Sequence, residues 1–504
     1  MTTTTTNPST ASPASRAATG ASVLFLSQIV GNALYFLAQR TIISEMPKES
    51  FGALAFVQQT CSLLLVVLVD AGLNNVAIRE MLHHPERKQS IVASSFWLRL
   101  ISTVVASIAI AAFFAATDLG LLTAAMVAVV SIATSGRMSM LRGSFELPFR
   151  AGMNYRLVSV LFVLDIALYA AALWIYPGTL TPEVVLALQF VCSLPGFVTL
   201  FARAGGTSLM FPVPSWQQMR GLIMETRSIL SQLVMQNIHA GLDIFILRYS
   251  SSLREVAVFG AVANISVVIL TLYSALSTAV FPLLAEKPGD GNAAALHHRI
   301  LRSMSFITYS TMVVAACLSV CASVIVSLFT KNLYADHLFE FQLQFWCTVL
   351  IVVTQFTIVV NTALKEHRAV LISGVMLIVG SLLFDFALIP TGGTRGMMIA
   401  KMLSNSLALG ANLLFISRIV GRPSIGLYLL RSAIAGAVLY SASIIFAQHF
   451  ATQYALLLTL AVSCITGITL RMITRADVDL LRGLVAKVSS RINRQSSTAS
   501  IAQE

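Results

Sequence analysis

Long apolar runs recur along the chain from residue 20 to residue 470, separated by short polar connections. A helix needs about 20 apolar residues to cross a hydrocarbon core of about 30 Å, and each run is about that long. The pattern predicts an all-α, polytopic membrane protein with about fourteen transmembrane helices. The predicted spans are 20–43, 51–78, 90–115, 119–140, 157–176, 183–202, 226–248, 256–284, 303–330, 343–364, 369–390, 396–417, 428–449 and 452–470.

Composition points to the same class. Hydrophobic residues make up 57% of the 504 and charged residues 11%, which leaves little material for a water-soluble domain. This balance excludes a disordered chain, a secreted disulfide scaffold and a nucleic-acid-binding protein, although the formal net charge is +12. No nucleic-acid partner is expected.

The distribution of the 33 Lys and Arg residues predicts the orientation in the membrane. With both termini in the cytoplasm, 25 of them fall on the cytoplasmic side, and Arg99 and Lys401 lie within spans. Positive residues collect on the cytoplasmic side of membrane proteins, so the count favours this orientation. The remaining residues, predicted to face outward, are Arg40, Lys48, Arg248, Arg254, Lys331 and Arg395.

The two ends of the chain carry no predicted span. Residues 1–19 are rich in Thr and Ser and are predicted to form a disordered tail. Residues 471–504 form a basic cytoplasmic tail, in which apolar residues recur at helical spacing from 475 to 494. This segment is predicted to form an amphipathic helix on the anionic inner leaflet, with a solvated tail as the alternative.

Sequence signals for an enzyme or a metal site are missing. All six cysteines lie inside apolar runs without C-x-x-C spacing, and there is no H-E-x-x-H, no nucleotide-binding P-loop and no G-x-S-x-G. The longest external connection, 331–342, is too short to carry an active-site domain. We therefore expect a transporter with no cofactor and no metal.

A weak internal repeat relates the two halves of the sequence. The matches are Leu26-Ser27-Gln28 with Leu230-Ser231-Gln232 at an offset of 204, and Arg40 with Arg248 and Phe51-Gly52 with Phe259-Gly260 at an offset of 208. Six predicted spans separate the copies, so both halves enter the membrane in the same direction. That is the parallel-repeat arrangement of two helix bundles.

Two polar stripes lie inside this repeat, on the 20–43 and 226–248 spans. Both have spacing 0, 4, 7, 11, which places each stripe along one helix face over about 16 Å. Polar side chains lose hydrogen bonds when they face lipid, so the stripes are predicted to line a watery cavity, with interhelical hydrogen bonding as the alternative. Their residues are Gln28, Asn32, Tyr35 and Gln39, and Gln232, Gln236, His239 and Asp243.

Four cations within or beside spans are candidate contacts for an anionic substrate head group. Arg40 and Arg248 lie near the outer ends of their spans, where snorkelling to lipid phosphates is the alternative. Arg99 lies about ten residues into its span, where an interior ion pair is favoured over a substrate contact. Lys401 lies five residues into the 396–417 span, within reach of the outer interface.

Acidic residues within the spans are candidates for ion coupling. His239 and Asp243 lie four apart on one face and could bind a proton or cation, although a structural hydrogen bond between them is the favoured interpretation. Asp70 is a third candidate, with capping or a pair with Arg79 as its alternative role. Asp165 lies mid-span and is expected to pair with a buried cation.

Several short motifs, in order, resemble those of a known family. They are Phe51-Gly52, Val69-Asp70-Ala71-Gly72-Leu73, Ile78-Arg79-Glu80, Asn361-Thr362-Ala363-Leu364-Lys365, Leu388-Ile389-Pro390, Gly393, Gly396 and Ile399-Ala400. The chain from about 20 to 470 thus resembles the polysaccharide exporter and O-antigen flippase branch of the multidrug/oligosaccharidyl-lipid/polysaccharide superfamily.

The resemblance implies two pseudo-symmetric six-helix lobes around a central cavity, followed by two further helices. On this basis the predicted domains are an N-lobe at 20–203, a cytoplasmic linker at 204–225, a C-lobe at 226–418 and the last two spans at 419–470. The implied cargo is an undecaprenyl-pyrophosphate-linked oligosaccharide, moved across the bacterial inner membrane by alternating access for exopolysaccharide or O-antigen (lipopolysaccharide) assembly. Membrane lipids, a polysaccharide polymerase and other assembly proteins are the implied partners.

Other functions remain open at this point. A drug/cation antiporter or a lipid II flippase of the same superfamily would share the fold, although such antiporters often carry an acidic residue in their first helix and the 20–43 span has none. A membrane polymerase is disfavoured by the short loops. Transport by the purified chain would eliminate a role as an assembly scaffold only.

Overall fold

The computed structural model describes residues 13–70, 73–117, 119–135, 140–152, 154–209, 213–285, 293–364 and 366–472. Every regular element in these ranges is helical. The α-helices are α1 Pro13–Glu45, α2 Lys48–Leu65, α3 Leu73–His83, α4 Lys88–Ala115, α5 Leu122–Thr134, α6 Leu141–Ala151, α7 Tyr155–Ile175, α8 Pro182–Ala204, α9 Trp216–Ser250, α10 Leu253–Ala285, α11 Ala293–Val320, α12 Ala322–Thr330, α13 Leu338–Ala363, α14 His367–Val420, α15 Arg422–His449 and α16 Thr452–Thr469. Short turns of other helix types link some of them, including the π-helical η2 Val66–Asp70.

Each of the fourteen predicted spans falls largely on helical residues, so the all-α, polytopic fold is confirmed. By length and composition, nine helices within the described residues qualify as membrane spans. One of them, α14, holds two predicted spans, 369–390 and 396–417. Its helix is interrupted at Gly393, whose φ of 53° and ψ of −133° are non-helical. A left-handed φ of this kind is favourable only for glycine.

Two helices begin earlier than the sequence pattern indicates. α1 starts at Pro13, so residues 13–19 of the predicted tail are helical; proline suits a first helical turn and the following alanines are strong helix formers. α9 starts at Trp216, inside the predicted linker, where Ser215 and Gln218 form a capping box that satisfies free backbone N–H groups. The predicted amphipathic helix at 475–494 lies outside the described residues.

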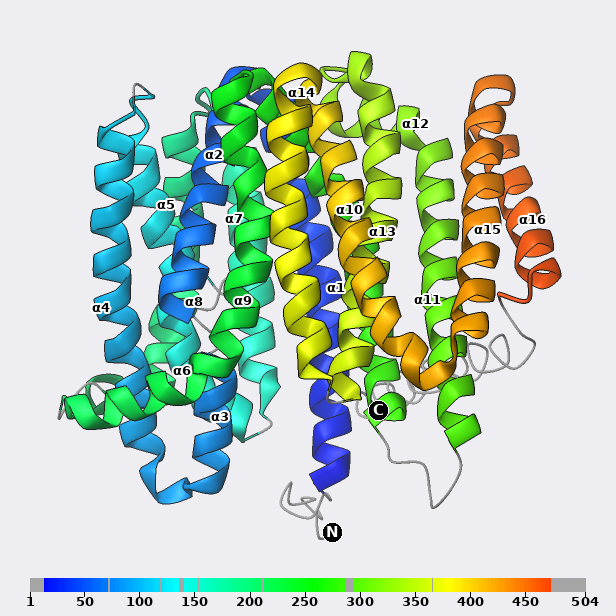
Figure 1. The fold of residues 1–504 in the computed structure, drawn as a ribbon. Coiled ribbons are helices and arrows are strands. Elements are labelled where there is room, and N and C mark those ends of the chain that lie inside the picture. The colour runs from blue at the N-terminus through cyan, green and yellow to red at the C-terminus, as the bar shows by residue number, and fades with distance from the viewer. Residues whose placement is uncertain are drawn as a thin grey trace, which may run out of the picture. The chain divides into compact units, whose positions relative to one another are not determined.

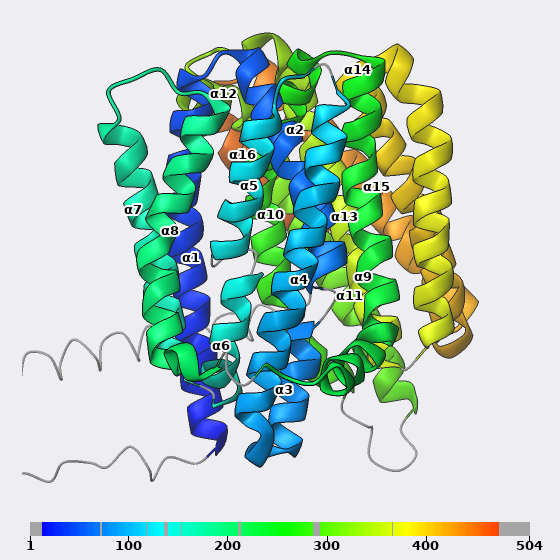
Figure 2. The ribbon, with the colours of Figure 1, turned by 90° about the vertical axis from the view of Figure 1, so that its left-hand side faces the viewer.

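The helices divide into two compact units that do not follow chain order. The first unit contains residues 1–265, 326–337 and 374–404. Within it α1 packs along α7, and α7 along α8, as Figure 2 shows. The first turns of α9 run across the ends of α3 and α4, at the lower left of Figure 1. The predicted lobe boundaries stay a prediction.

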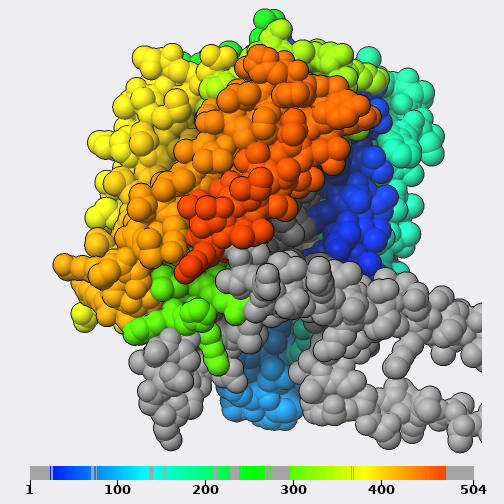
Figure 3. Space-filling model, turned by 90° about the vertical axis from the view of Figure 1, so that its right-hand side faces the viewer, coloured from blue at the N-terminus to red at the C-terminus, as the bar shows by residue number. Residues whose placement is uncertain are grey.

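The second unit contains residues 266–325, 338–373 and 405–504. α11 is its central described helix, in contact with α13, α15 and α16. Hydroxyl groups connect these helices: Thr308 and Tyr428 share a hydrogen bond of 2.7 Å, and Tyr309 donates to the backbone oxygen of Ser463. In the space-filling view of Figure 3, α15 and α16 lie side by side on one face of this unit.

The Phe-Gly pairs of the internal repeat lie where α2 meets α10. A Cβ atom on Gly52 would lie 1.9 Å from the Leu253 backbone oxygen, and one on Gly260 would lie 3.1 Å from the Ala55 Cβ. The missing side chain of each glycine therefore lets the neighbouring helix approach closely. At Gly52 the close contact is with backbone atoms of α10, and at Gly260 it is with the Ala55 side chain. This crossing lies at the end of the first unit that is predicted to face outward.

Replacing Gly52 with Ala is expected to destabilise the protein by about 1–3 kcal/mol, because a backbone oxygen cannot move aside for the new methyl group. Thermal unfolding of the purified protein in detergent would measure this. Gly410→Ala is the matched control, because a Cβ there meets nothing within 4 Å. Equal melting temperatures for the two variants would show that the helices do not approach so closely.

Candidate functional site

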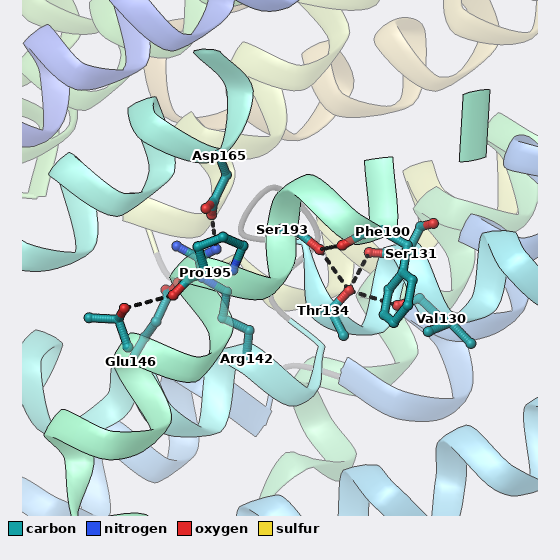
Figure 4. A network of polar contacts seen from close by, with 10 residues as sticks. Val130, Ser131, Thr134, Arg142, Glu146, Asp165, Phe190, Ser193 and Pro195 are labelled. Atoms are coloured by element: carbon teal, nitrogen blue, oxygen red, sulfur yellow. Dashed lines mark hydrogen bonds and ion pairs between the residues drawn. The ribbon is translucent and has the colours of Figure 1, made fainter. Parts of the chain in front are cut away.

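A chain of alternating buried charges lies in the first unit. Arg142 of α6 donates to the Asp165 carboxylate of α7 and, through Nε, to Glu146 Oε1 at 3.2 Å. Glu146 Oε2 in turn accepts from Arg150 Nη2 at 2.6 Å. Figure 4 shows the Asp165 carboxylate turned toward Arg142. The two positive and two negative groups sum to zero, so this cluster is electrically self-contained.

Local packing brings Asp165 into position. A Cβ atom on Gly196 of α8 would lie 2.5 Å from either carboxylate oxygen of Asp165, so only glycine leaves room for it. Next to the carboxylate is a cavity of about 40 Å³, which also has Tyr35, Gln189 and Ser193 in its lining. A cavity of this size is large enough for a water molecule, and Asp165, Gln189 and Ser193 supply polar groups in its lining. Tyr35 of the predicted stripe is part of the lining of this cavity, and its role in a passage for substrate stays a prediction.

A second buried charge cluster forms between α9 and the part of α14 on either side of Gly393, also within the first unit. Lys401 Nζ lies 2.7 Å from Asp243 Oδ2, and both side chains are buried. The same ammonium group lies 4.4 Å from the centre of the Phe259 ring, which adds a cation–π contact. His239 Nδ1 shares a hydrogen bond with the Ser381 hydroxyl.

Asp385 of α14 completes this cluster. Its side chain is 1% exposed, and neither carboxylate oxygen has a hydrogen-bond partner within the described residues. It interacts electrostatically with both Asp243 and Lys401. One lysine therefore faces two buried carboxylates, and the cluster carries an uncompensated negative charge when both are ionised. We call Asp243, Asp385, Lys401 and His239 the α9–α14 cluster.

Two expectations about this cluster are corrected. Lys401 does not reach the outer interface, because it turns inward to pair with Asp243. His239 bonds to Ser381 and not to Asp243, whose ion-pair partner is the lysine. In both cases the side chain bonds to a residue on another helix, and not to the outer interface or to the neighbour on its own helix. The predicted roles in head-group binding and coupling remain predictions.

Polar contacts also gather at the predicted outer end of the first unit. Arg254 Nε lies 2.9 Å from Glu49 Oε1, which connects the start of α10 with the start of α2. Lys48 Nζ lies 5.1 Å from the centre of the Tyr334 ring, and burial raises the pKa of that phenol well above its ordinary value, so it stays neutral. Lys331 pairs with Glu45 of α1. The six contributing side chains hold this end of the unit together.

The two repeat-related arginines have unused donors. Arg40 Nε donates to the Leu328 backbone oxygen at 2.8 Å, while its two Nη atoms make no hydrogen bond or ion pair within the described residues. Arg248 is half-buried, and its buried Nε atom has no hydrogen-bond partner among the residues that the structure describes. Arginine presents five N–H donors in a planar fork that suits phosphate and carboxylate groups.

The remaining candidates occupy varied environments. On α1, Gln28 is exposed, Asn32 is half-buried and Gln39 is 4% exposed. Arg99 is fully buried, and its Nη1 donates to the Ser144 hydroxyl at 3.3 Å; its expected ion pair stays a prediction. The side chains of Gln232, Gln236 and Asp70 lie outside what the structure describes, and Arg79 pairs with Glu225 at 2.7 Å.

Sequence reasoning placed α6 in a cytoplasmic connection and so missed its charges. The expected buried cation for Asp165 is Arg142, which is 0% exposed. A signal was present, because Arg142, Glu146 and Arg150 follow one another at intervals of four with alternating sign. Within the described residues, no three His, Cys, Asp or Glu side chains gather closely enough to hold a metal ion.

Comparison with known proteins adds independent findings. The sequence model of a family described as "Polysaccharide biosynthesis protein" matches residues 17–287, more than half of the chain. No curated protein matches the chain.

Several solved structures share the fold. A structure titled "Lipid II flippase MurJ, inward closed conformation" has a TM-score of 0.68 at 10% identity, over 89% of this chain and 99% of that one. An inward-facing multidrug resistance MATE family transporter of the MOP superfamily has a TM-score of 0.59 at 18% identity, over 77% and 94%. A MOP superfamily transporter from Pyrococcus furiosus has a TM-score of 0.55 at 16% identity, over 81% and 96%.

Proposed function

The chain belongs to the polysaccharide biosynthesis protein family, and from that premise we propose that it is a flippase for an undecaprenyl-pyrophosphate-linked oligosaccharide. It is a multi-pass membrane protein and a transporter, not an enzyme. The cargo would cross the bacterial inner membrane for exopolysaccharide or O-antigen assembly. A polysaccharide polymerase and other assembly proteins would act on it after transfer.

The unused donors of Arg40 and Arg248 are the observation that carries this proposal. A buried guanidinium nitrogen without a partner is costly, and an anionic ligand that supplies an acceptor would offset the cost. A pyrophosphate group offers several charged oxygens for two such forks. The polar stripe on α1 supplies amide and hydroxyl partners for the sugars, while the prenyl tail stays in lipid.

Alternating access requires the outer end of the first unit to open. That end is held by the Arg254–Glu49 and Lys331–Glu45 pairs between exposed side chains, which are individually weak. The α9–α14 cluster is the proposed coupling element, with Asp70 as a further candidate. A proton or cation bound at Asp243 would weaken its hold on Lys401, so an ion gradient could bias the equilibrium between two states.

Orientation follows the charge count. We assign both termini to the cytoplasm, because 25 of the 33 Lys and Arg residues then lie on that side. The end of the first unit that carries Arg40, Arg254 and Lys331 then faces the periplasm.

Purified protein in proteoliposomes is expected to move an undecaprenyl-pyrophosphate-linked oligosaccharide across the bilayer. Transfer would be measured as the fraction of oligosaccharide that a membrane-impermeant glycosidase can reach over time. Replacing both Arg40 and Arg248 with Ala is expected to slow transfer about tenfold or more, because charge-assisted hydrogen bonds to the pyrophosphate are lost. The variant should insert normally, because both residues lie near helix ends.

Parallel assays separate this function from its rivals. Transfer of lipid II in place of the oligosaccharide lipid would favour a lipid II flippase, and gradient-driven ethidium transport would favour a drug antiporter. Absence of transfer for every lipid-linked substrate would leave a scaffold role and overturn the proposal.

A further inference from the structure

A cleft of about 620 Å³ opens at the predicted outer end of the first unit. The last turns of α1, the end of α7, the connection at 176–180 and Lys331 form its walls. Ligand sites for small molecules usually have volumes of about 300–1,000 Å³, so this cleft is large enough for one or two sugar rings. It is separate from the α9–α14 cluster and from the cavity beside Asp165.

An aromatic side chain is held rigidly in the wall of this cleft. Trp174 Nε1 donates to the Thr41 hydroxyl at 2.9 Å, which fixes the polar edge of the indole against α1. The side chain nevertheless remains 61% exposed, and Tyr176 lies close by in the same lining. The face of an aromatic ring carries partial negative charge and attracts the C–H bonds on the apolar face of a sugar ring. A fixed, exposed indole is therefore suited to stack against a pyranose.

The charges in the lining select among sugars. Of the two cations that line the cleft, Lys331 is already paired with Glu45. Arg40 keeps both Nη atoms available within the described residues, because only its Nε is used, by Leu328. The two Nη atoms of one guanidinium can bind both oxygens of a carboxylate. Glu45 can accept hydrogen bonds from sugar hydroxyls.

We propose that this cleft is an outer subsite for a carboxylate-bearing sugar of the transported oligosaccharide. The carboxylate binds the same Arg40 guanidinium that is proposed above for the pyrophosphate, at a separate stage of transfer, and the sugar ring stacks on Trp174. The proposal rests on the function proposed above and adds the substrate class. A lipid phosphate would use the cation alone and would leave the indole without a role.

The test uses the full-length protein in phosphatidylcholine nanodiscs and two soluble probes. Hyaluronan tetrasaccharide, which contains glucuronic acid, should bind, and the neutral, fully N-acetylated chitotetraose should bind about tenfold more weakly or worse, because it lacks the carboxylate. Saturation-transfer NMR and calorimetry would measure both. Arg40→Gln and Trp174→Ala should each weaken hyaluronan binding by about tenfold.

Matched variants control for general effects. Trp216 is 63% exposed and lies outside the cleft, so Trp216→Ala should bind like the wild type. Arg395→Gln removes an exposed positive charge that is predicted to face outward and lies outside the cleft lining, so this variant should also bind normally. Stability of each variant would be checked by thermal unfolding.

The outcomes are distinct. Equal binding by Trp174→Ala and wild type, or equal binding of the two probes, would overturn the acidic-sugar subsite. Loss of hyaluronan binding when phosphatidylglycerol is added to the nanodiscs, with no weakening by Trp174→Ala, would assign the cleft to lipid phosphates. Failure of wild-type protein to transfer any lipid-linked oligosaccharide refutes the proposed function; normal transfer with no hyaluronan binding refutes only the subsite.

Discussion

Replacing Lys401 with Met is expected to lower the free energy of unfolding by about 3–5 kcal/mol, because removal of one partner from a buried ion pair leaves an uncompensated charge. The ammonium group lies 2.7 Å from Asp243 Oδ2, and Asp385 is buried in the same cluster. The variant would keep two buried carboxylates with no cation between them. Thermal unfolding in detergent and oligosaccharide transfer in proteoliposomes would record losses of stability and of transport.

A double variant separates structure from function. Lys401→Met combined with Asp243→Asn removes both charges of the pair and should recover most of the lost stability. It should not recover transfer if the pair takes part in coupling. If Lys401→Met has the same melting temperature as the wild type, the pair carries no buried charge. If the double variant transfers oligosaccharide normally, the cluster has no part in coupling.

The second large effect is expected at Arg142. Arg142→Met would leave the Asp165 carboxylate without its cation and would leave Glu146 with Arg150 alone. Because Arg142 is 0% exposed, the expected loss is again about 3–5 kcal/mol. The melting temperature should fall well below that of Arg203→Met, a control in which the replaced arginine is exposed.

Adding Asp165→Asn to Arg142→Met tests the cause. The neutral amide removes the unpaired charge, so the double variant should melt above the single one. If the order is reversed, the destabilisation arises from lost packing at α6 and not from charge. Transfer activity of the double variant would show whether the α6–α7 charges serve only the fold.

The spans were predictable from sequence because the membrane imposes a local rule. A run of about twenty apolar residues is helical in lipid whatever its neighbours are. The fourteen predicted segments fall largely on helical residues, including the pair that meets at Gly393 inside α14, and nine helices within the described residues qualify as spans by length and composition. The rule failed at α6, because Arg142, Glu146 and Arg150 lower the hydropathy there while their charges cancel within the folded protein.

Side-chain direction was the part that sequence could not provide. Lys401 could equally have extended to the interface, and its ion pair with Asp243, on a helix far away in the chain, turns it inward. His239 and Asp243 share one helix face, yet each bonds to α14 and not to the other. Spacing along one helix identifies which side chains are neighbours on that helix. The side chain to which each one bonds depends on the helix packed against it. The roles of Arg40 and Arg248 at repeat-related positions stay predictions.

The break in α14 has a consequence for biosynthesis. Beyond Gly393 the helix restarts at Thr394, whose backbone N–H donates to Glu255 Oε2 at 2.8 Å and whose hydroxyl donates to the Glu255 backbone oxygen at 3.0 Å. The cap of this restarted helix thus comes from α10, which leaves the ribosome well over a hundred residues earlier. The acceptor is therefore already synthesised when the second half of α14 emerges, and this half receives its cap only after the chain has folded back onto α10.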